Sequence, residues 1–283
     1  MSAEKKKKET PFWVGGASST LATAVTHPID LFKVRKQTQI VKISYTELVT
    51  SLVRNEGVLG IYAGLSASIF RQLTYGTARF AVYDELKRKL SQRNALNGTT
   101  QLLSAVVAGT VGGIVGNPLD LAMIRMQNDG KLPLSQQRKY KWAGDAVYRA
   151  IREEGLARGL FTGISANIGR AVVVTASQLV SYDVFKASLL SYDFPDTLST
   201  HFGASFLAGL VATTACNPVD VVKSRVMADK TGQYSGFTRV FAKIAREEGL
   251  GAFMKGWVTA YLRMAPQVVL IFVFYEQIKR LVV

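Results

Sequence analysis

Three arginines stand inside otherwise apolar segments, and each precedes an acidic residue by 13 positions. The pairs are Arg71 with Asp84, Arg170 with Asp183, and Arg263 with Glu276. A guanidinium stays charged where the dielectric constant is low and holds a carboxylate or phosphate through two parallel hydrogen bonds. An ionisable residue inside a membrane costs about 2.5 to 3.5 kcal/mol and usually faces water or a partner. The arginines therefore indicate a binding site for a small anion with two acidic groups.

The composition points to an anionic partner and away from enzymatic chemistry. The chain has 283 residues, 48% of them hydrophobic, and a formal charge of +15, which suits nucleic acid, phospholipid or a small acid. Cys216 is the single cysteine and lies in an apolar run, so we expect a buried hydrophobic side chain. His27 and His201 are far apart and lack ligand-like neighbours. We expect no metal, no cofactor and no catalytic group.

Three copies of one pattern cover the chain. "HPIDLFKVRKQ", "NPLDLAMIRMQ" and "NPVDVVKSRVM" share Pro-x-Asp and an arginine seven residues after the proline. A Glu-Gly element and then a Tyr-acid-x-x-Lys element follow each copy. Internal repetition of this kind marks a repeat architecture. We expect a polar tail at 1–10, which does not resemble a signal peptide, and repeats at 11–97, 98–196 and 197–283.

Apolar helices connect these elements. Residues 10–29, 94–119 and 197–219 contain no Asp, Glu, Lys or Arg, and each stretch is long enough to cross about 30 Å of hydrocarbon. Stretches near 66–87, 164–187 and 258–280 are apolar but carry charges, so we expect a hydropathy window to underrate them. The Pro-x-Asp prolines are expected to end the first set of helices. The result is an all-α membrane protein with six transmembrane helices and three short amphipathic surface helices.

Small residues predict where these helices pack closely. Ala105, Gly109 and Gly113 recur at four-residue spacing, and Gly15 and Gly16 stand together in the first apolar stretch. Because lipid tails are as apolar as leucine, helices in a membrane gain mainly by close van der Waals approach. We expect helix contacts at both places.

The threefold Px[DE]xx[KR]x[KR] pattern and the three [FY][DE]xx[KR] elements resemble the mitochondrial carrier family over essentially the whole chain. This resemblance implies six helices in pseudo-threefold arrangement around a central cavity, in the inner mitochondrial membrane, exchanging small solutes. "RQLTYGTARF", "MQNDGKLP" and "RAVVVTASQLVSYD" are most similar to dicarboxylate carriers, and oxoglutarate carriers resemble the first stretch nearly as well. Uncoupling proteins share shorter fragments.

The resemblance implies a gate on the matrix side of the cavity. It pairs Asp120 with Lys223 and Asp220 with Lys33, whereas Asp30 would face Met123, so we expect two bridges rather than three. Family members also place glutamines beneath the bridges, and here these are Gln37 and Gln127, with Met227 at the third position. With a bridge missing, we expect this gate to be the weaker one.

A second, cytoplasmic gate is implied by the three Tyr-acid-x-x-Lys elements. Its members are Tyr83, Asp84, Lys87, Tyr182, Asp183, Lys186, Tyr275, Glu276 and Lys279. The implied pairs are Asp84 with Lys186, Asp183 with Lys279 and Glu276 with Lys87. Exposed ion pairs contribute about 0.2 to 1 kcal/mol each, and weak bonds suit a gate.

The central site would lie between the two gates. The resemblance assigns substrate binding to Arg71, Arg170 and Arg263, which we expect to have no carboxylate at their own level. Arg79 has no arginine counterpart in the other repeats and is a weaker candidate. Thr74, Tyr75, Thr175 and Gln178 are candidates for hydrogen bonds to the substrate.

We therefore expect an antiporter that exchanges malate or succinate for another dicarboxylate or phosphate by alternating access. A carrier for oxoglutarate or oxaloacetate, an uncoupling-type proton conductor and a soluble nucleic-acid-binding protein remain alternatives. Charge-free spans argue against nucleic acid. The other expected partners are membrane lipids such as cardiolipin, at Gly64, Gly163 and Gly256 where the surface helices lead back into the membrane. We expect a functional monomer.

Overall fold

The computed structural model describes residues 13–39, 44–95, 97–192, 194–195, 197–229 and 236–282, so the tail at 1–10 lies outside the described residues. Within these ranges the chain is helical and contains no strand. The long helices are α1 (Trp13–Gln37), α3 (Leu65–Gln92), α4 (Gly98–Asp129), α6 (Ile164–Ser191), α7 (Leu198–Ala228) and α9 (Trp257–Val282). The shorter elements are α2 (Tyr45–Glu56), η1 (Val58–Tyr62), η2 (Leu134–Gln136), α5 (Ala143–Phe161), α8 (Phe237–Glu247) and η3 (Leu250–Met254).

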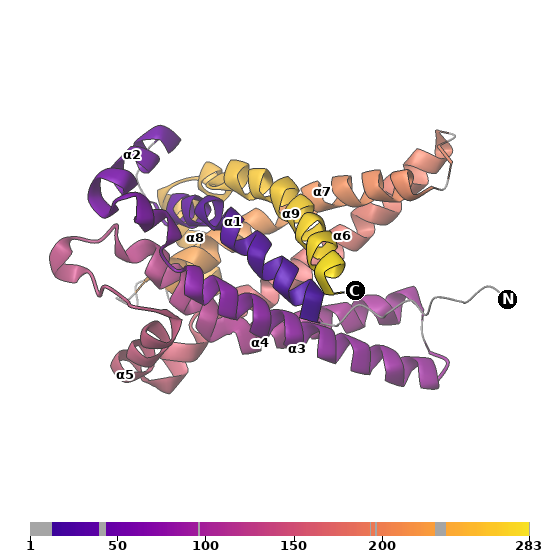
Figure 1. Ribbon diagram of the computed structural model, residues 1–283, viewed down its shortest axis with the longest axis horizontal. Helices are drawn as coiled ribbons and strands as arrows, with labels where there is room; N and C mark the ends of the chain where they lie inside the picture. The colour runs from indigo at the N-terminus through magenta and orange to yellow at the C-terminus, as the bar shows by residue number, and fades with distance from the viewer. Residues whose placement is uncertain are drawn as a thin grey trace.

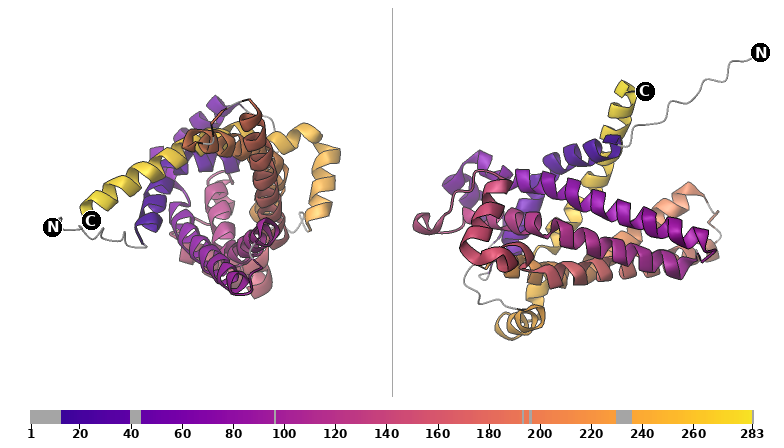
Figure 2. Two further views of the ribbon diagram at one scale, coloured as in Figure 1. Left: turned by 90° about the vertical axis from the view of Figure 1, so that its right-hand side faces the viewer. Right: turned by 90° about the horizontal axis from the view of Figure 1, so that it is seen from below.

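The long helices form a ring in which each contacts two neighbours, in the order α1, α3, α4, α6, α7, α9 and back to α1. Figure 2 (left) shows this ring viewed along its axis. The most extensive contacts join α3 to α4, α6 to α7 and α9 to α1. The six-helix, threefold arrangement predicted from the sequence is confirmed.

The ring has two different ends. At one end, which we name the closed end, the carboxyl-terminal turns of α1, α4 and α7 meet, and α2, α5 and α8 lie around them (Figure 1). At the other, the open end, residues 83–87, 182–186 and 275–279 lie on helix pairs that diverge (Figures 1 and 2). Buried hydrophobic clusters are found at the closed end, for example Val34, Leu121, Ile124, Ala150 and Met227.

The prolines do not end the helices that contain them, and this expectation was wrong. Pro28, Pro118 and Pro218 lie inside α1, α4 and α7, which continue about ten residues beyond each proline. A proline removes one helical hydrogen bond, but that loss is tolerated in membrane helices when neighbouring groups satisfy the freed carbonyl. The aspartate after each proline is therefore carried on a helix rather than in a loop.

Glycine is required where each surface helix ends. Gly57, Gly155 and Gly249 have φ angles of 73°, 80° and 77°, a region that L side chains rarely adopt. A glycine terminator is thus present in all three repeats, including the break at Gly155 inside α5. Each terminator turns the chain toward the next long helix.

Close packing by small residues is confirmed in α4 but not in α1. A Cβ on Gly109 would lie 3.4 Å from Ala171 of α6. A Cβ on Gly112, which the sequence did not single out, would lie 3.1 Å from the carbonyl oxygen of Tyr75 in α3. Gly15 and Gly16 have nothing within 4 Å, so those two positions make no close helix contact. α4 is therefore wedged between both of its neighbours.

Apolar composition alone identifies four of the described stretches as long and apolar enough to cross a membrane. They are Gly98–Asp129, Ala143–Ser191, Gly203–Ala228 and Leu250–Leu281. We expected a hydropathy window to underrate all three charge-bearing helices. This was wrong for α6 and α9, which lie in stretches that are long and apolar enough to cross a membrane. α1 and α3 have sufficient length but fall short in hydropathy, and the ring contacts place them with the other four.

Candidate functional site: a charged cavity above the closed end

A cavity at the centre of the ring rests on the closed end. All six long helices supply its charged lining, which consists of Asp30, Lys33, Arg71, Asp120, Arg170, Asp220, Lys223 and Arg263. Five of these side chains are basic and three are acidic. The cavity therefore carries two positive charges in excess of its own carboxylates.

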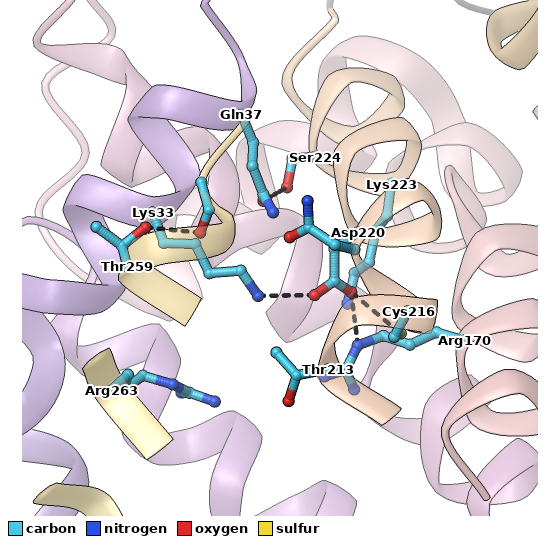
Figure 3. A network of polar contacts seen from close by, with 12 residues as sticks. Lys33, Gln37, Arg170, Thr213, Cys216, Asp220, Lys223, Ser224, Thr259 and Arg263 are labelled. Carbon is cyan, nitrogen blue, oxygen red and sulfur yellow. Dashed lines mark hydrogen bonds and ion pairs between the residues drawn. The ribbon is translucent and has the colours of Figure 1, made fainter. Parts of the chain in front are cut away.

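Two lysine bridges hold the floor of the cavity. Lys33 Nζ lies 2.7 Å from Asp220 Oδ2, which joins α1 to α7 (Figure 3). Lys223 Nζ lies 2.9 Å from Asp120 Oδ2, which joins α7 to α4. Both pairs match the sequence prediction. At the third position Met123 lines the cavity and contributes no charge.

The three arginines do have carboxylates at their own level, contrary to expectation. Arg170 Nε lies 2.7 Å from Asp220 Oδ1, as Figure 3 shows, and Arg263 Nη1 lies 2.8 Å from Asp30 Oδ1. The contact of Arg71 Nε with Asp120 Oδ1 is longer, at 3.5 Å. Because the helices continue through their prolines, each aspartate lies level with the arginine of the adjoining helix.

The expected two-bridge gate is therefore too simple. Asp30 lacks the lysine that its counterparts have, but Arg263 also contacts its second oxygen at 2.9 Å. Asp120 and Asp220 each contact one lysine and one arginine. The proposed binding arginines and the proposed gate share the same three carboxylates.

The other binding candidates are placed unevenly. Tyr75 lines a small side chamber beside Arg71, and Gln178 lines a second chamber beside Arg170. The hydroxyls of Thr74 and Thr175 donate to carbonyls of their own helices. Arg79 is exposed on α3 and forms no ion pair with another described residue.

Of the three positions beneath the bridges, one forms a cross-helix hydrogen bond through its side chain. Gln37 Oε1 accepts a hydrogen bond from Ser224 Oγ at 2.8 Å (Figure 3). The side-chain amide of Gln127 is buried and forms no hydrogen bond with a described residue. Met227 occupies the third position and is fully buried. These side chains fill the space below the lysine bridges.

A second, complete ring of arginines lies below them, and the sequence reading assigned it no role. Arg35, Arg125 and Arg225 each bind both oxygens of one glutamate, in the pairs Arg35–Glu56, Arg125–Glu154 and Arg225–Glu248. The hydrogen bonds from Arg225 hold the pKa of the Glu248 carboxyl below its ordinary value. Because the arginine and the glutamate both recur in all three repeats, the sequence did contain a signal for these pairs.

The same arginines also join successive repeats. Their Nε atoms donate to the backbone carbonyls of Gln127, Met227 and Gln37, from Arg35, Arg125 and Arg225 respectively. A backbone carbonyl is present whatever the side chain, so Met227 serves here as well as glutamine. Each repeat is thus tied both to its own surface helix and to the next repeat.

His27 has a structural position rather than a metal-binding one. Its Nε2 lies 2.9 Å from the carbonyl of Ala63, just before α3. In the other repeats Asn117 donates to the carbonyls of Leu160 and Thr162, and Asn217 donates to the carbonyl of Phe253. No group of three potential metal ligands occurs in the part of the chain that the structure describes.

At the open end the expected charge pairs are not formed. Among the described residues, no ion pair joins Asp84 to Lys186, Asp183 to Lys279 or Glu276 to Lys87, and Glu276 instead lies 3.7 Å from Arg280 of its own helix. The associated tyrosines are Tyr83, Tyr182 and Tyr275, and Tyr182 Oη lies 2.5 Å from His201 Nδ1. Since the helix pairs diverge here, the three elements do not close a ring.

Comparison with known proteins decides the family. The sequence model described as mitochondrial carrier protein matches residues 10–94, 94–193 and 194–283, which together cover the chain from residue 10 onward. The chain belongs to the mitochondrial carrier family. It is a multi-pass protein of the inner mitochondrial membrane, with the closed end on the matrix side by the resemblance noted above.

Curated relatives match over nearly their full length. Mitochondrial citrate transporter F of Aspergillus niger is 44% identical, with 99% of this chain and 92% of the relative covered. The mitochondrial dicarboxylate transporter of Saccharomyces cerevisiae is 43% identical, with 97% and 93% covered. The mitochondrial dicarboxylate carrier of Caenorhabditis elegans is 41% identical, with 99% and 96% covered.

Proposed function

We propose that this carrier exchanges a dicarboxylate such as malate or succinate for another dicarboxylate or inorganic phosphate, by alternating access and without enzymatic chemistry. The observation that carries the proposal is the charge of the cavity. Five basic and three acidic side chains leave two positive charges, which a dianion neutralises. Two of the three relatives described above are named for dicarboxylates.

The arrangement of Arg71 supports an anion at this place. Arg71 Nε and Asp120 Oδ1 are both buried and neither forms a hydrogen bond with a described residue, because 3.5 Å is too long for one. A buried polar atom without a partner is costly. A substrate carboxylate that accepts a hydrogen bond from Arg71 satisfies this donor.

The carboxylates shared by the gate and the binding arginines couple substrate binding to opening of the closed end. A substrate carboxylate competes with Asp120, Asp220 and Asp30 for the arginines, and so weakens the links that hold the closed end. Without substrate, the two excess positive charges have to be enclosed uncompensated when the cavity closes, and burying unpaired charge is unfavourable. Exchange is therefore favoured over net transport.

A liposome exchange assay tests the proposal. Vesicles containing the purified protein and loaded with phosphate are expected to take up labelled malate, whereas unloaded vesicles take up little. Brisk oxoglutarate exchange without malate–phosphate exchange would instead support the oxoglutarate alternative. Nucleotide-sensitive proton leak without solute exchange would support an uncoupling-type conductor.

The relative from Aspergillus niger carries a citrate transporter's name, so citrate is the second candidate substrate. Citrate has a third carboxylate, whereas the excess positive charge of the cavity is sufficient to neutralise two carboxylates. In the same assay we expect citrate to exchange more slowly than malate. Faster citrate exchange would overturn the dicarboxylate assignment while leaving antiport intact.

We further propose a monomer with anionic lipid at its closed end as the functional unit. One chain supplies all six cavity helices, so no second copy is needed to complete the site. Gly64, Gly163 and Gly256 lie immediately before the starts of α3, α6 and α9, where the backbone N–H groups of a helix favour a phosphate. Native mass spectrometry in cardiolipin-containing membranes tests both points.

A further inference from the structure

The closed end has three seams, and the threefold repeat allows them to be compared directly. At the aspartate level Lys33–Asp220 closes the seam between α1 and α7, and Lys223–Asp120 closes the seam between α7 and α4. The seam between α4 and α1 has Met123 at the equivalent position. Arg263 neutralises Asp30, but it links α9 to α1 and does not cross from α4 to α1.

The α4–α1 seam has contacts of its own below this gap. Lys131, which follows α4, donates from Nζ to the carbonyl of Arg35 and to Thr38 Oγ1, both at 3.0 Å. Thr38 Oγ1 lies 2.5 Å from Asn128 Oδ1. A lysine, a threonine and an asparagine thus connect the end of α4 to the last turn of α1.

Among the described residues, the other seams do not repeat this cluster. By the Pro-x-Asp register, Thr38 corresponds to Asn128 in the second repeat and to Ala228 in the third, and an alanine cannot take part in a side-chain hydrogen bond. The Lys131 cluster therefore occurs at the one seam that lacks a lysine bridge.

We propose that Lys131, together with the Thr38–Asn128 contact, locks the α4–α1 seam in place of the missing bridge at position 123. The hydrogen bonds to the Arg35 carbonyl and to Thr38 Oγ1 require a donor at position 131 but no charge. When the closed end opens, α1 and α4 part and these hydrogen bonds break. The proposal rests on alternating access but not on the identity of the substrate.

Burial and charge around Lys131 make this lock easy to release. Among the described residues, no carboxylate lies within ion-pair distance of its ammonium. Burial, together with the guanidinium groups of Arg35 and Arg225, lowers the pKa of Lys131 to about 7, and Glu56 only partly opposes this. Charge on Lys131 thus weakens rather than strengthens the closed state.

The test uses thermal unfolding and the reactivity of Cys216, which is buried in α7 beside the cavity. In oriented vesicles, an impermeant maleimide added at the matrix face reaches Cys216 when the closed end opens. Lys131→Met is expected to raise the labelling rate about tenfold and lower the unfolding temperature by a few degrees. Thr38→Val removes the same contact from α1 and should act in the same direction.

Rescue at position 123 distinguishes a lock from a merely structural lysine. Met123→Lys supplies the missing partner for Asp30. In the Lys131→Met and Thr38→Val backgrounds it should therefore reverse at least half of the rise in labelling rate and half of the fall in unfolding temperature. Lys141→Met is the control, because Lys141 is an exposed lysine ten residues further along the chain. The proposal is overturned if Lys131→Met behaves like Lys141→Met, or if Met123→Lys has the same effect with and without Lys131. Neither readout requires transport, so failure of the proposed substrate leaves this test intact.

Discussion

The two ends of the helix ring carry the same kind of residues but organise them differently. At the closed end, bridges between helices lie above bidentate arginine–glutamate pairs whose guanidiniums are almost fully buried. At the open end, the charged residues of the Tyr-acid-x-x-Lys elements are mostly exposed and form none of the three expected inter-repeat pairs among the described residues. Repeated charge motifs therefore specify possible partners, and the conformation decides which partners meet.

The closed end itself contains two layers of charged residues with different partners. The lower ring of Arg35, Arg125 and Arg225 ties each repeat to its surface helix and to its neighbour. The upper layer of lysines and aspartates is shared with the cavity arginines, so an anion can compete for it. We therefore expect the lower ring to contribute mainly to stability and the upper layer mainly to transport.

The largest effect is expected from breaking the lower ring. Glu154→Gln leaves the guanidinium of Arg125, whose side chain is 1% exposed, without its carboxylate. Removing one partner of a buried pair costs about 3 to 5 kcal/mol. Thermal unfolding should shift down by many degrees. Glu85→Gln, at an exposed pair near the open end, is the control and should leave the unfolding temperature unchanged; equal shifts would remove the contrast between the ends.

A large effect on transport is expected from the upper layer. Arg71→Ala removes a proposed substrate contact, while Asp120 keeps Lys223 and Asn167 as partners, so the protein should still fold. Losing a buried charged contact costs about 2 to 5 kcal/mol, which corresponds to about 30-fold or more in exchange rate. Malate exchange by purified variants measures this. Arg88→Ala, an exposed arginine of the same helix, should exchange normally, and parallel losses in both would contradict a central role for Arg71.

A smaller effect is expected from pH at the matrix face. The pKa of Lys131 is lowered to about 7 by burial and by Arg35 and Arg225, with Glu56 opposing. When the closed end opens, water reaches the ammonium and its pKa returns toward the ordinary value of about 10.4, so opening takes up a proton above about pH 7. Raising the matrix-side pH should favour the closed end by up to about tenfold per pH unit, and acidification to about pH 7 should favour opening.

Malate–malate exchange with the pH of one face varied measures this dependence, because malate keeps its charge over that range. Lys131→Arg remains protonated and should respond weakly, whereas Lys141→Arg should behave like the natural protein. An unchanged slope in Lys131→Arg would assign the pH dependence to another group.

Repetition in the sequence was enough to predict six helices in three equivalent repeats, because three copies of one motif have to occupy equivalent places. The partners of Lys33 and Lys223 were assigned from the resemblance to the carrier family, and both pairs are present in the structure. Helix ends were predicted less well. Pro28 and its counterparts were read as terminators, because a proline's local preference is visible in the sequence and the tertiary contacts that override it are not.

Contacts that depend on register between helices could not be predicted. The pairing of Arg263 with Asp30 follows from how far α1 continues past Pro28, and that length is set by packing at the closed end. Lys131 lies outside the repeated motifs, so neither period nor spacing singled it out. The arginine–glutamate ring, in contrast, was present in the repeats and could have been inferred from Arg35, Glu56 and their counterparts.

The proposed transport mechanism requires that a dicarboxylate, by binding the cavity arginines, releases the closed end and brings the open-end elements together. Disulfide formation between Lys87→Cys and Glu276→Cys, in a Cys216→Ala background, tests it most directly, because cross-linking requires these helices to approach closely. Malate should accelerate cross-linking severalfold, and a monocarboxylate such as lactate should not. Cross-linking that is unaffected by malate, or equally accelerated by lactate, would contradict this mechanism.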